Sequence, residues 1–209
     1  MYSNLYNYIS IYWRNYIDKT NLDEVIRYLN NDSRLIIPSI DNIFKCFENI
    51  KPEEVKYVIL GTEPFVNPDI ASGLCYSVPE NINPTSEIIK FNKLFNQTDF
   101  VHENMVKEGY LLLNLRLTTT NKTKGAHKGI GWENIIYKIL SKLYNDFENI
   151  TFISLDINSK TIFKSLSNNW FRTKSSNAER FRAKNDFARR SKEKYIDYEF
   201  NHELNIINL

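Results

Sequence analysis

The stretch Val55-Lys56-Tyr57-Val58-Ile59-Leu60-Gly61, followed by Thr62-Glu63-Pro64-Phe65-Val66, decides the fold of this chain. An apolar, β-branched run that stops at glycine and proline is typical of a buried parallel strand. The loop after such a strand lies at the carboxyl edge of the sheet, where open α/β sheets bind their ligands. Glu63 stands in this loop between a glycine, which lets the backbone turn, and a proline, which stiffens it. Glu63 is therefore the first candidate active-site group.

The composition is that of an ordinary globular protein. The chain has 209 residues, of which 42% are hydrophobic and 25% charged, so we expect one domain spanning 1–209 with a single sizeable core. No apolar run approaches the roughly 18 residues that a membrane span needs. Residues 1–4 lack the basic start of a signal peptide. We therefore expect an intracellular protein, in the cytoplasm or nucleus, with no membrane partner.

The few cysteines and histidines argue against a metal centre. Cys46 and Cys75 lie in apolar-patterned segments without metal-ligand spacing, which favours buried thiols in a reducing compartment. The three histidines, His102, His127 and His202, are far apart in the sequence. We expect neither a metal nor another cofactor.

Periodicity predicts further elements along the chain. An apolar stripe at helical spacing indicates a first helix, through Leu22, Val25, Ile26 and Leu29. Asp41 is expected to cap a second helix, through Ile43, Phe44 and Phe47. Thr85 or Ser86 is expected to cap a helix that runs through Ile89, Leu94 and Phe95. Apolar runs predict buried strands at 110–114 and 151–155, helices at 132–147 and 157–166, and a last strand near 169–172.

Five stretches of the chain resemble motifs of the uracil-DNA glycosylases. That family has Val-Val-Ile-Leu-Gly, Gln-Asp-Pro-Tyr-His and Gly-Leu-Cys-Phe-Ser-Val where this chain has 57–61, 62–66 and Gly73-Leu74-Cys75-Tyr76-Ser77-Val78. The family's Gln-Gly-Val-Leu-Leu-Leu-Asn is similar to 108–114, and its His-Lys-x-x-Gly-Trp-Glu to 127–133. The resemblance covers about residues 13–200. It implies an α/β fold with a central, mainly parallel four-stranded sheet flanked by helices.

The resemblance also implies a base pocket with altered chemistry. Glu63 is the counterpart of the family's catalytic Asp, and four residues are the expected substrate-binding groups (Thr62, Phe65, Tyr76 and Asn114). Tyr76 offers a flat face on which a base can stack, and Asn114 matches the residue that reads the polar edge of uracil. Thr62 replaces a Gln, and Val66 replaces a polar group. The walls of the pocket are kept better than its reactive groups.

Contacts to nucleic acid are expected at the family's phosphate-binding positions and in a basic stretch. Residues 172–194 contain nine lysines or arginines and three carboxylates, which is typical either of a solvated surface or of a footprint for phosphates. The expected nucleic-acid-binding residues are Ser86, His127, Lys128, Thr173, Lys174, Ser175, Arg180, Arg189 and Arg190.

The second catalytic loop of the family has no full counterpart. Its histidine would align with Phe171 or Thr173, and no histidine stands between His127 and His202. The wedge leucine would align with 175–177, where no apolar leucine-like residue occurs. We therefore favour a glycosylase-like protein with weakened or lost base excision that is retained for binding DNA, uracil-containing or single-stranded, or a protein partner. Two alternatives stay open: an active divergent glycosylase in base-excision repair that uses Glu63, and a protein-interaction module that no longer binds DNA.

Overall fold

A four-stranded parallel sheet forms the centre of the molecule. The computed structural model describes residues 2–155, 161–163 and 195–197. The strands follow the order β3 (Tyr110–Asn114), β2 (Tyr57–Gly61), β5 (Thr151–Ser154) and β6 (Tyr195–Asp197), and each neighbouring pair is parallel. This arrangement confirms the predicted α/β fold. A separate antiparallel pair joins β1 (Ile36–Ile37) to β4 (Thr119–Thr120).

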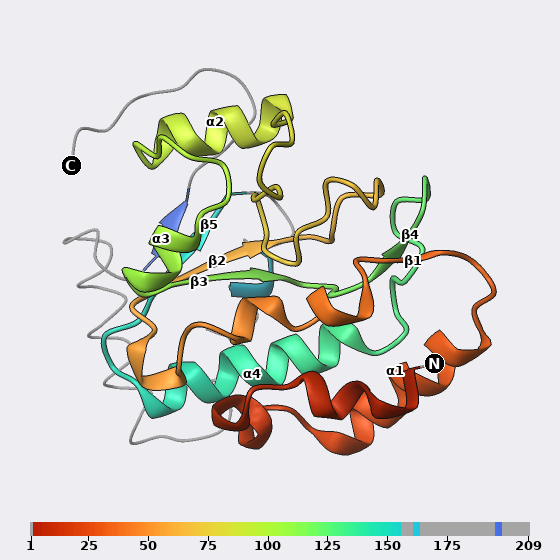
Figure 1. Cartoon of the computed structure of the whole chain (residues 1–209). Coiled ribbons are helices and arrows are strands. Elements are labelled where there is room, and N and C mark those ends of the chain that lie inside the picture. The colour runs from red at the N-terminus through yellow and green to blue at the C-terminus, as the bar shows by residue number, and fades with distance from the viewer. Residues whose placement is uncertain (1, 156–160, 164–194, 198–209) are drawn as a thin grey trace.

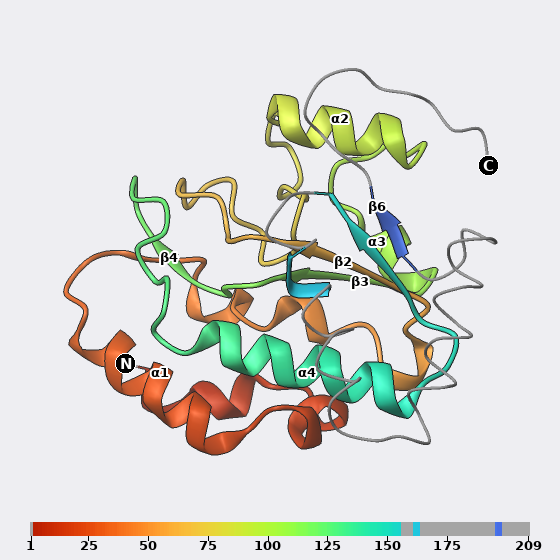
Figure 2. The same ribbon diagram turned by 180° about the vertical axis from the view of Figure 1, so that it is seen from behind.

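Helices cover both faces of the sheet (Figures 1 and 2). On one face lie α4 (Trp132–Asp146) and α1 (Lys19–Asn31) with the 3-10 helices Tyr2–Tyr8 and Ile11–Tyr16. On the other face lie α2 (Ser86–Leu94) and α3 (Glu103–Lys107). Three more short 3-10 helices connect these elements, at Ile40–Asn42, Lys45–Phe47 and Pro52–Glu54.

The core fills the space between the sheet and α4. Val58, Ile59 and Leu60 of β2 are fully buried, as a strand covered on both faces requires. The inner face of α4 is equally buried, through Trp132, Ile135, Ile136, Ile139, Leu140 and Leu143. Each large side chain removed from water in this way stabilises the fold by roughly 1.5 to 3 kcal/mol.

Most of the predicted elements are present, but one helix is not. The predicted helix from Asp41 to Phe47 was wrong, because this segment forms two short 3-10 turns separated at Phe44, whose φ of −107° and ψ of 17° lie outside the α-helical region. The packing of the Phe44 ring against Trp132 and of Phe47 against Trp13 outweighs local helix propensity here. Of the predicted helix 157–166 only 161–163 are described, and they are helical. The predicted strand near 169–172 lies outside the described residues.

Candidate active site

The site forms where β2 and β3 end side by side. Gly61, the last residue of β2, pairs with Asn114, the last residue of β3. A Cβ at Gly61 would lie 2.5 Å from Asn114 Oδ1 and 2.9 Å from Cys75 Cβ, both closer than real contacts allow. Glycine is therefore required at position 61 so that the Asn114 side chain can lie across the end of β2.

A cavity of about 340 Å³ opens at this edge of the sheet. That volume is in the range of small-molecule sites. The structure brings together all five pocket residues predicted from the sequence, which are Thr62, Glu63, Phe65, Tyr76 and Asn114. The rest of the lining is formed by Gly61, Pro64, Val66, Ala71, Ser72, Gly73, Leu74, Cys75, Glu87 and Lys124.

A stack of rings supports the Tyr76 wall. Tyr76 lies in a turn with a φ of 57°, rather than at a strand end. Its ring stacks on Phe91 of α2, with centroids 5.0 Å apart and planes within 6°. Behind Phe91 lies the buried His102 ring, with centroids 4.9 Å apart. Because each ring is fixed by the next, Tyr76 offers a rigid face to the cavity.

Asn114 is the polar group of the pocket floor. Its side chain is buried, and within the described part of the chain its amide makes no hydrogen bond to protein. A buried amide normally has partners. Both its donor and its acceptor are therefore available to a ligand in the cavity, which is the arrangement needed to read the edge of a base.

Two protein groups hold the Glu63 carboxylate, the Gly125 backbone amide and the Arg116 side chain. Both of its oxygens lie 2.9 Å from the Gly125 backbone N–H, which donates to them. The Arg116 guanidinium lies beside it, with Nε 3.5 Å from Oε2. This Arg116 N–H is not directed at the carboxylate, so the contact is an ion pair rather than a hydrogen bond. A carboxylate paired in this way has part of its charge already neutralised.

Sequence reasoning missed Arg116, which links two carboxylates. Its Nη1 lies 3.3 Å from Glu133 Oε1, so the guanidinium lies between Glu63 and Glu133. The signal was present in the sequence, because an arginine between Leu115 and Leu117 in an otherwise apolar run needs charged partners when it is buried.

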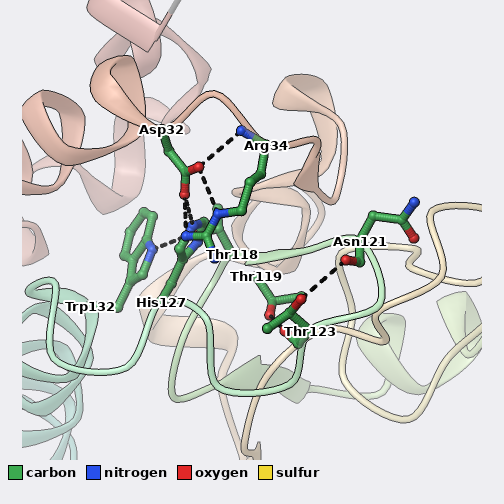
Figure 3. A network of polar contacts seen from close by, with 8 residues as sticks. All are labelled: Asp32, Arg34, Thr118, Thr119, Asn121, Thr123, His127 and Trp132. Atoms are coloured by element: carbon green, nitrogen blue, oxygen red, sulfur yellow. Dashed lines mark hydrogen bonds and ion pairs between the residues drawn. The ribbon is translucent and has the colours of Figure 1, made fainter.

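His127, a predicted nucleic-acid contact, is part of a buried polar network. The ring is fully buried, with Nδ1 2.7 Å from Thr118 Oγ1 and Nε2 3.1 Å from Asp32 Oδ2 (Figure 3). Trp132 Nε1 also donates to Thr118 Oγ1, at 2.7 Å. An Nε2–H facing the Asp32 carboxylate leaves Nδ1 as the acceptor of the Thr118 hydroxyl. His127 therefore fixes the start of α4 against the end of α1.

The charges around His127 follow from this network. Burial lowers the pKa of His127, which favours the neutral ring. Hydrogen bonds from Arg34 hold the pKa of Asp32 far below its usual range, so this carboxylate stays ionised. A neutral ring donating to an ionised acid is a stable arrangement over the neutral pH range.

The other predicted phosphate contacts lie at the surface or beyond the described residues. Ser86, the first residue of α2 after the N-cap Thr85, and Lys128 are both exposed. Lys124 is exposed as well and lines the cavity. Six predicted residues lie outside the described part of the chain (Thr173, Lys174, Ser175, Arg180, Arg189 and Arg190).

Across residues 2–155, 161–163 and 195–197 there is no group of three or more histidine, cysteine or acidic side chains that could hold a metal. Cys46 and Cys75 are buried free thiols, and burial raises the pKa of Cys46. None of the described helices is both long and apolar enough to cross a membrane.

Comparison with known proteins decides the family. No family model matches the chain. A uracil-DNA glycosylase of Azobacteroides pseudotrichonymphae is 30% identical over 154 residues, which cover 68% of this chain and 70% of that protein. The chain belongs to the uracil-DNA glycosylase family. The uracil-DNA glycosylase of Ureaplasma parvum is 29% identical over 143 residues, covering 63% of this chain and 68% of that protein.

Solved structures show the same glycosylase fold. A variant of mimivirus UNG in complex with UGI superposes with a TM-score of 0.69 at 16% identity, covering 95% of this chain and 72% of that one. The UNG of Nitratifractor salsuginis superposes with a TM-score of 0.56 at 19% identity, covering 77% and 80%. The membership predicted from the sequence motifs is confirmed.

Proposed function

We propose that this glycosylase-family protein binds DNA and accepts a base in its cavity, while excising uracil very slowly or not at all. The observation that carries the proposal is the engagement of Glu63 by Arg116 and Gly125 beside an open pocket. We also propose that residues 1–209 act as one glycosylase-like domain.

The binding half of the proposal depends on the pocket walls. A base that is removed from DNA must leave the stack and enter a pocket. The cavity here offers an aromatic wall at Tyr76, a second ring at Phe65 and the Asn114 amide. Lys124, which lines the cavity, and the exposed Lys128 and Ser86 supply groups for the phosphates.

The chemical half depends on charge. Cleavage of the glycosidic bond develops positive charge on the sugar, which a carboxylate stabilises only if its own charge is not already balanced. Arg116, 3.5 Å from Glu63, balances that charge and adds a cation near the place where the sugar cation would form. Glu63 is also one methylene longer than the family's Asp, and a displacement near 1 Å costs on the order of 100-fold in rate.

The sequence also supplies no histidine for the leaving uracil at the family's position, since none stands between His127 and His202, and His127 is buried in its own network. One such electrostatic group is commonly worth about 2.7 to 4 kcal/mol. Two losses of about 3 kcal/mol remove roughly four orders of magnitude in rate.

An assay with single-stranded DNA carrying one uracil tests the proposal. The DNA is incubated with purified protein, treated with alkali to cut abasic sites, and resolved on a gel, while binding is followed by fluorescence anisotropy. We expect salt-dependent binding and no cut strand above background. Efficient cutting supports the active-glycosylase alternative, for which the position of Glu63 in the cavity lining is the favouring observation. Absence of binding supports the protein-interaction alternative.

A further inference from the structure

The segment 121–131, which carries three exposed lysines, is held by two carboxylates. The lysines are Lys122, Lys124 and Lys128. Glu63 accepts from the Gly125 N–H at 2.9 Å through both oxygens, and Glu133 accepts from the Gly129 N–H at 3.2 and 3.3 Å. Each carboxylate thus fixes the amide of one glycine. The two glycines are four residues apart, and each directly follows a lysine.

Arg116 joins the two carboxylates into one unit. Its guanidinium lies 3.5 Å from Glu63 and 3.3 Å from Glu133, with only 10% of its side chain exposed. A buried arginine between two acids is a strong constraint, because moving either acid leaves its charge uncompensated. The three side chains come from the loop after β2, the segment after β3 and the first turn of α4.

The backbone adds a further link between the pocket loop and the lysine segment. The Lys122 N–H donates to the Val66 carbonyl at 3.0 Å. Gly125 and Gly129 have φ values of 70° and 78°, which few other residues adopt without strain. The glycines therefore allow the amides on either side of His127 to turn toward the acids.

We propose that Glu63 is a positioning residue: with Arg116 and Glu133 it clamps segment 121–131 so that Lys124, which lines the cavity, and the exposed Lys128 are presented to nucleic-acid phosphates. This inference rests on the proposed DNA binding. It gives the carboxylate at the catalytic position a role in binding instead of in chemistry.

The first test is hydrogen exchange of the Gly125 and Gly129 amides, followed by NMR in the full chain. In Glu63→Ala we expect exchange at Gly125 to accelerate by at least about tenfold, because its charged acceptor is lost. Glu133→Ala should do the same at Gly129. Glu108→Ala is the matched control, since this exposed acid lies at the amino end of β3, at the opposite edge of the sheet. Unchanged exchange at Gly125 in Glu63→Ala overturns the clamp.

The second test uses the sign of a change in DNA affinity. Removing an acid near a polyanion should tighten binding if the acid acts only through its charge. The clamp predicts the reverse: Glu63→Ala weakens binding of a fluorescein-labelled single-stranded oligonucleotide carrying one uracil by about three- to tenfold, and lowers the salt slope by roughly one. Glu63→Gln keeps an acceptor for the Gly125 amide and should restore part of the affinity. Equal or tighter binding by Glu63→Ala contradicts the proposal.

The two tests separate the clamp from the proposed function. If the unmodified protein does not bind DNA, the proposed function fails and the claim that the clamp serves phosphates fails with it, whereas the exchange data still decide whether Glu63 fixes Gly125. If DNA is bound and neither exchange nor affinity responds to Glu63→Ala, the clamp alone is wrong.

Discussion

The walls of the cavity and its carboxylate are built in opposite ways. The Asn114 amide faces the cavity without a protein partner in the described residues, and Tyr76 offers a flat ring held from behind by Phe91. Glu63, in contrast, already has an arginine and a backbone amide as partners. A pocket can thus remain complementary to a base while the group that would drive the reaction is committed to the protein itself. Shape and reactivity are separable properties of one site.

Acid should lower the folding stability of the protein, through His102 behind the Tyr76 wall, more than any of the single substitutions below. Burial lowers the pKa of His102 from 6.5 to about 4, while Asp99 opposes this shift. Between these two values the unfolded chain binds a proton that the folded chain does not, so stability falls as the pH decreases from about 6.5 to 4. The loss is on the order of 3 kcal/mol. Urea unfolding at pH 7.5 and pH 4.5 measures it.

His102→Gln is the matched variant for this effect, since an amide can still bond Asn92, whose Oδ1 lies 2.6 Å from His102 Nε2. It should lose less stability in acid than the unmodified protein. An equal loss in both proteins assigns the acid sensitivity to other groups, such as the buried His127.

Gly61→Ala should close the cavity. The added methyl meets Asn114 Oδ1 at 2.5 Å and Cys75 Cβ at 2.9 Å, so the Asn114 amide must move. We expect a loss of about 1 to 3 kcal/mol in stability and no rise in melting temperature with uracil-containing DNA. Thermal unfolding with and without the DNA measures both. A preserved thermal shift indicates that the base does not enter beside Asn114.

Asn114→Ala tests the polar floor of the pocket and should change stability little, since the amide has no partner in the described residues. Binding of uracil-containing DNA should weaken by about tenfold relative to the unmodified protein, as one or two hydrogen bonds are lost. Asn83→Ala, at an exposed position before α2, is the control. Equal binding of DNA with cytosine in place of uracil by the unmodified protein shows that the polar edge of the base is not read, because the 4-amino group of cytosine donates where O4 of uracil accepts.

Lys124→Ala should have the smallest effect. Loss of one phosphate contact lowers the slope of log affinity against log salt by about 0.7 for single strands. The affinity itself should fall only a few-fold, equally for oligonucleotides with and without uracil. Anisotropy titrations at several salt concentrations provide the slope, and an unchanged slope removes Lys124 from the interface.

The sequence predicted the sheet better than the site, for a physical reason. β2, β3 and α4 are long apolar patterns whose burial is encoded locally, and Asn114 follows because it ends such a strand. The prediction of a helix at 41–47 was wrong because the ring packing of this segment depends on Trp13 and Trp132, which are far away in the chain. The pairing of Arg116 with Glu63 and Glu133, and the burial of His127, are likewise long-range contacts that periodicity does not encode.

Uracil excision by the unmodified protein is the measurement that tests the central claim most directly. Single-turnover assays with excess protein over a uracil-containing single strand should show a rate at least about four orders of magnitude below that of an intact family member assayed in parallel. Glu63→Gln should leave this residual rate unchanged. Efficient excision that Glu63→Gln abolishes would contradict the account and establish Glu63 as a working catalytic carboxylate.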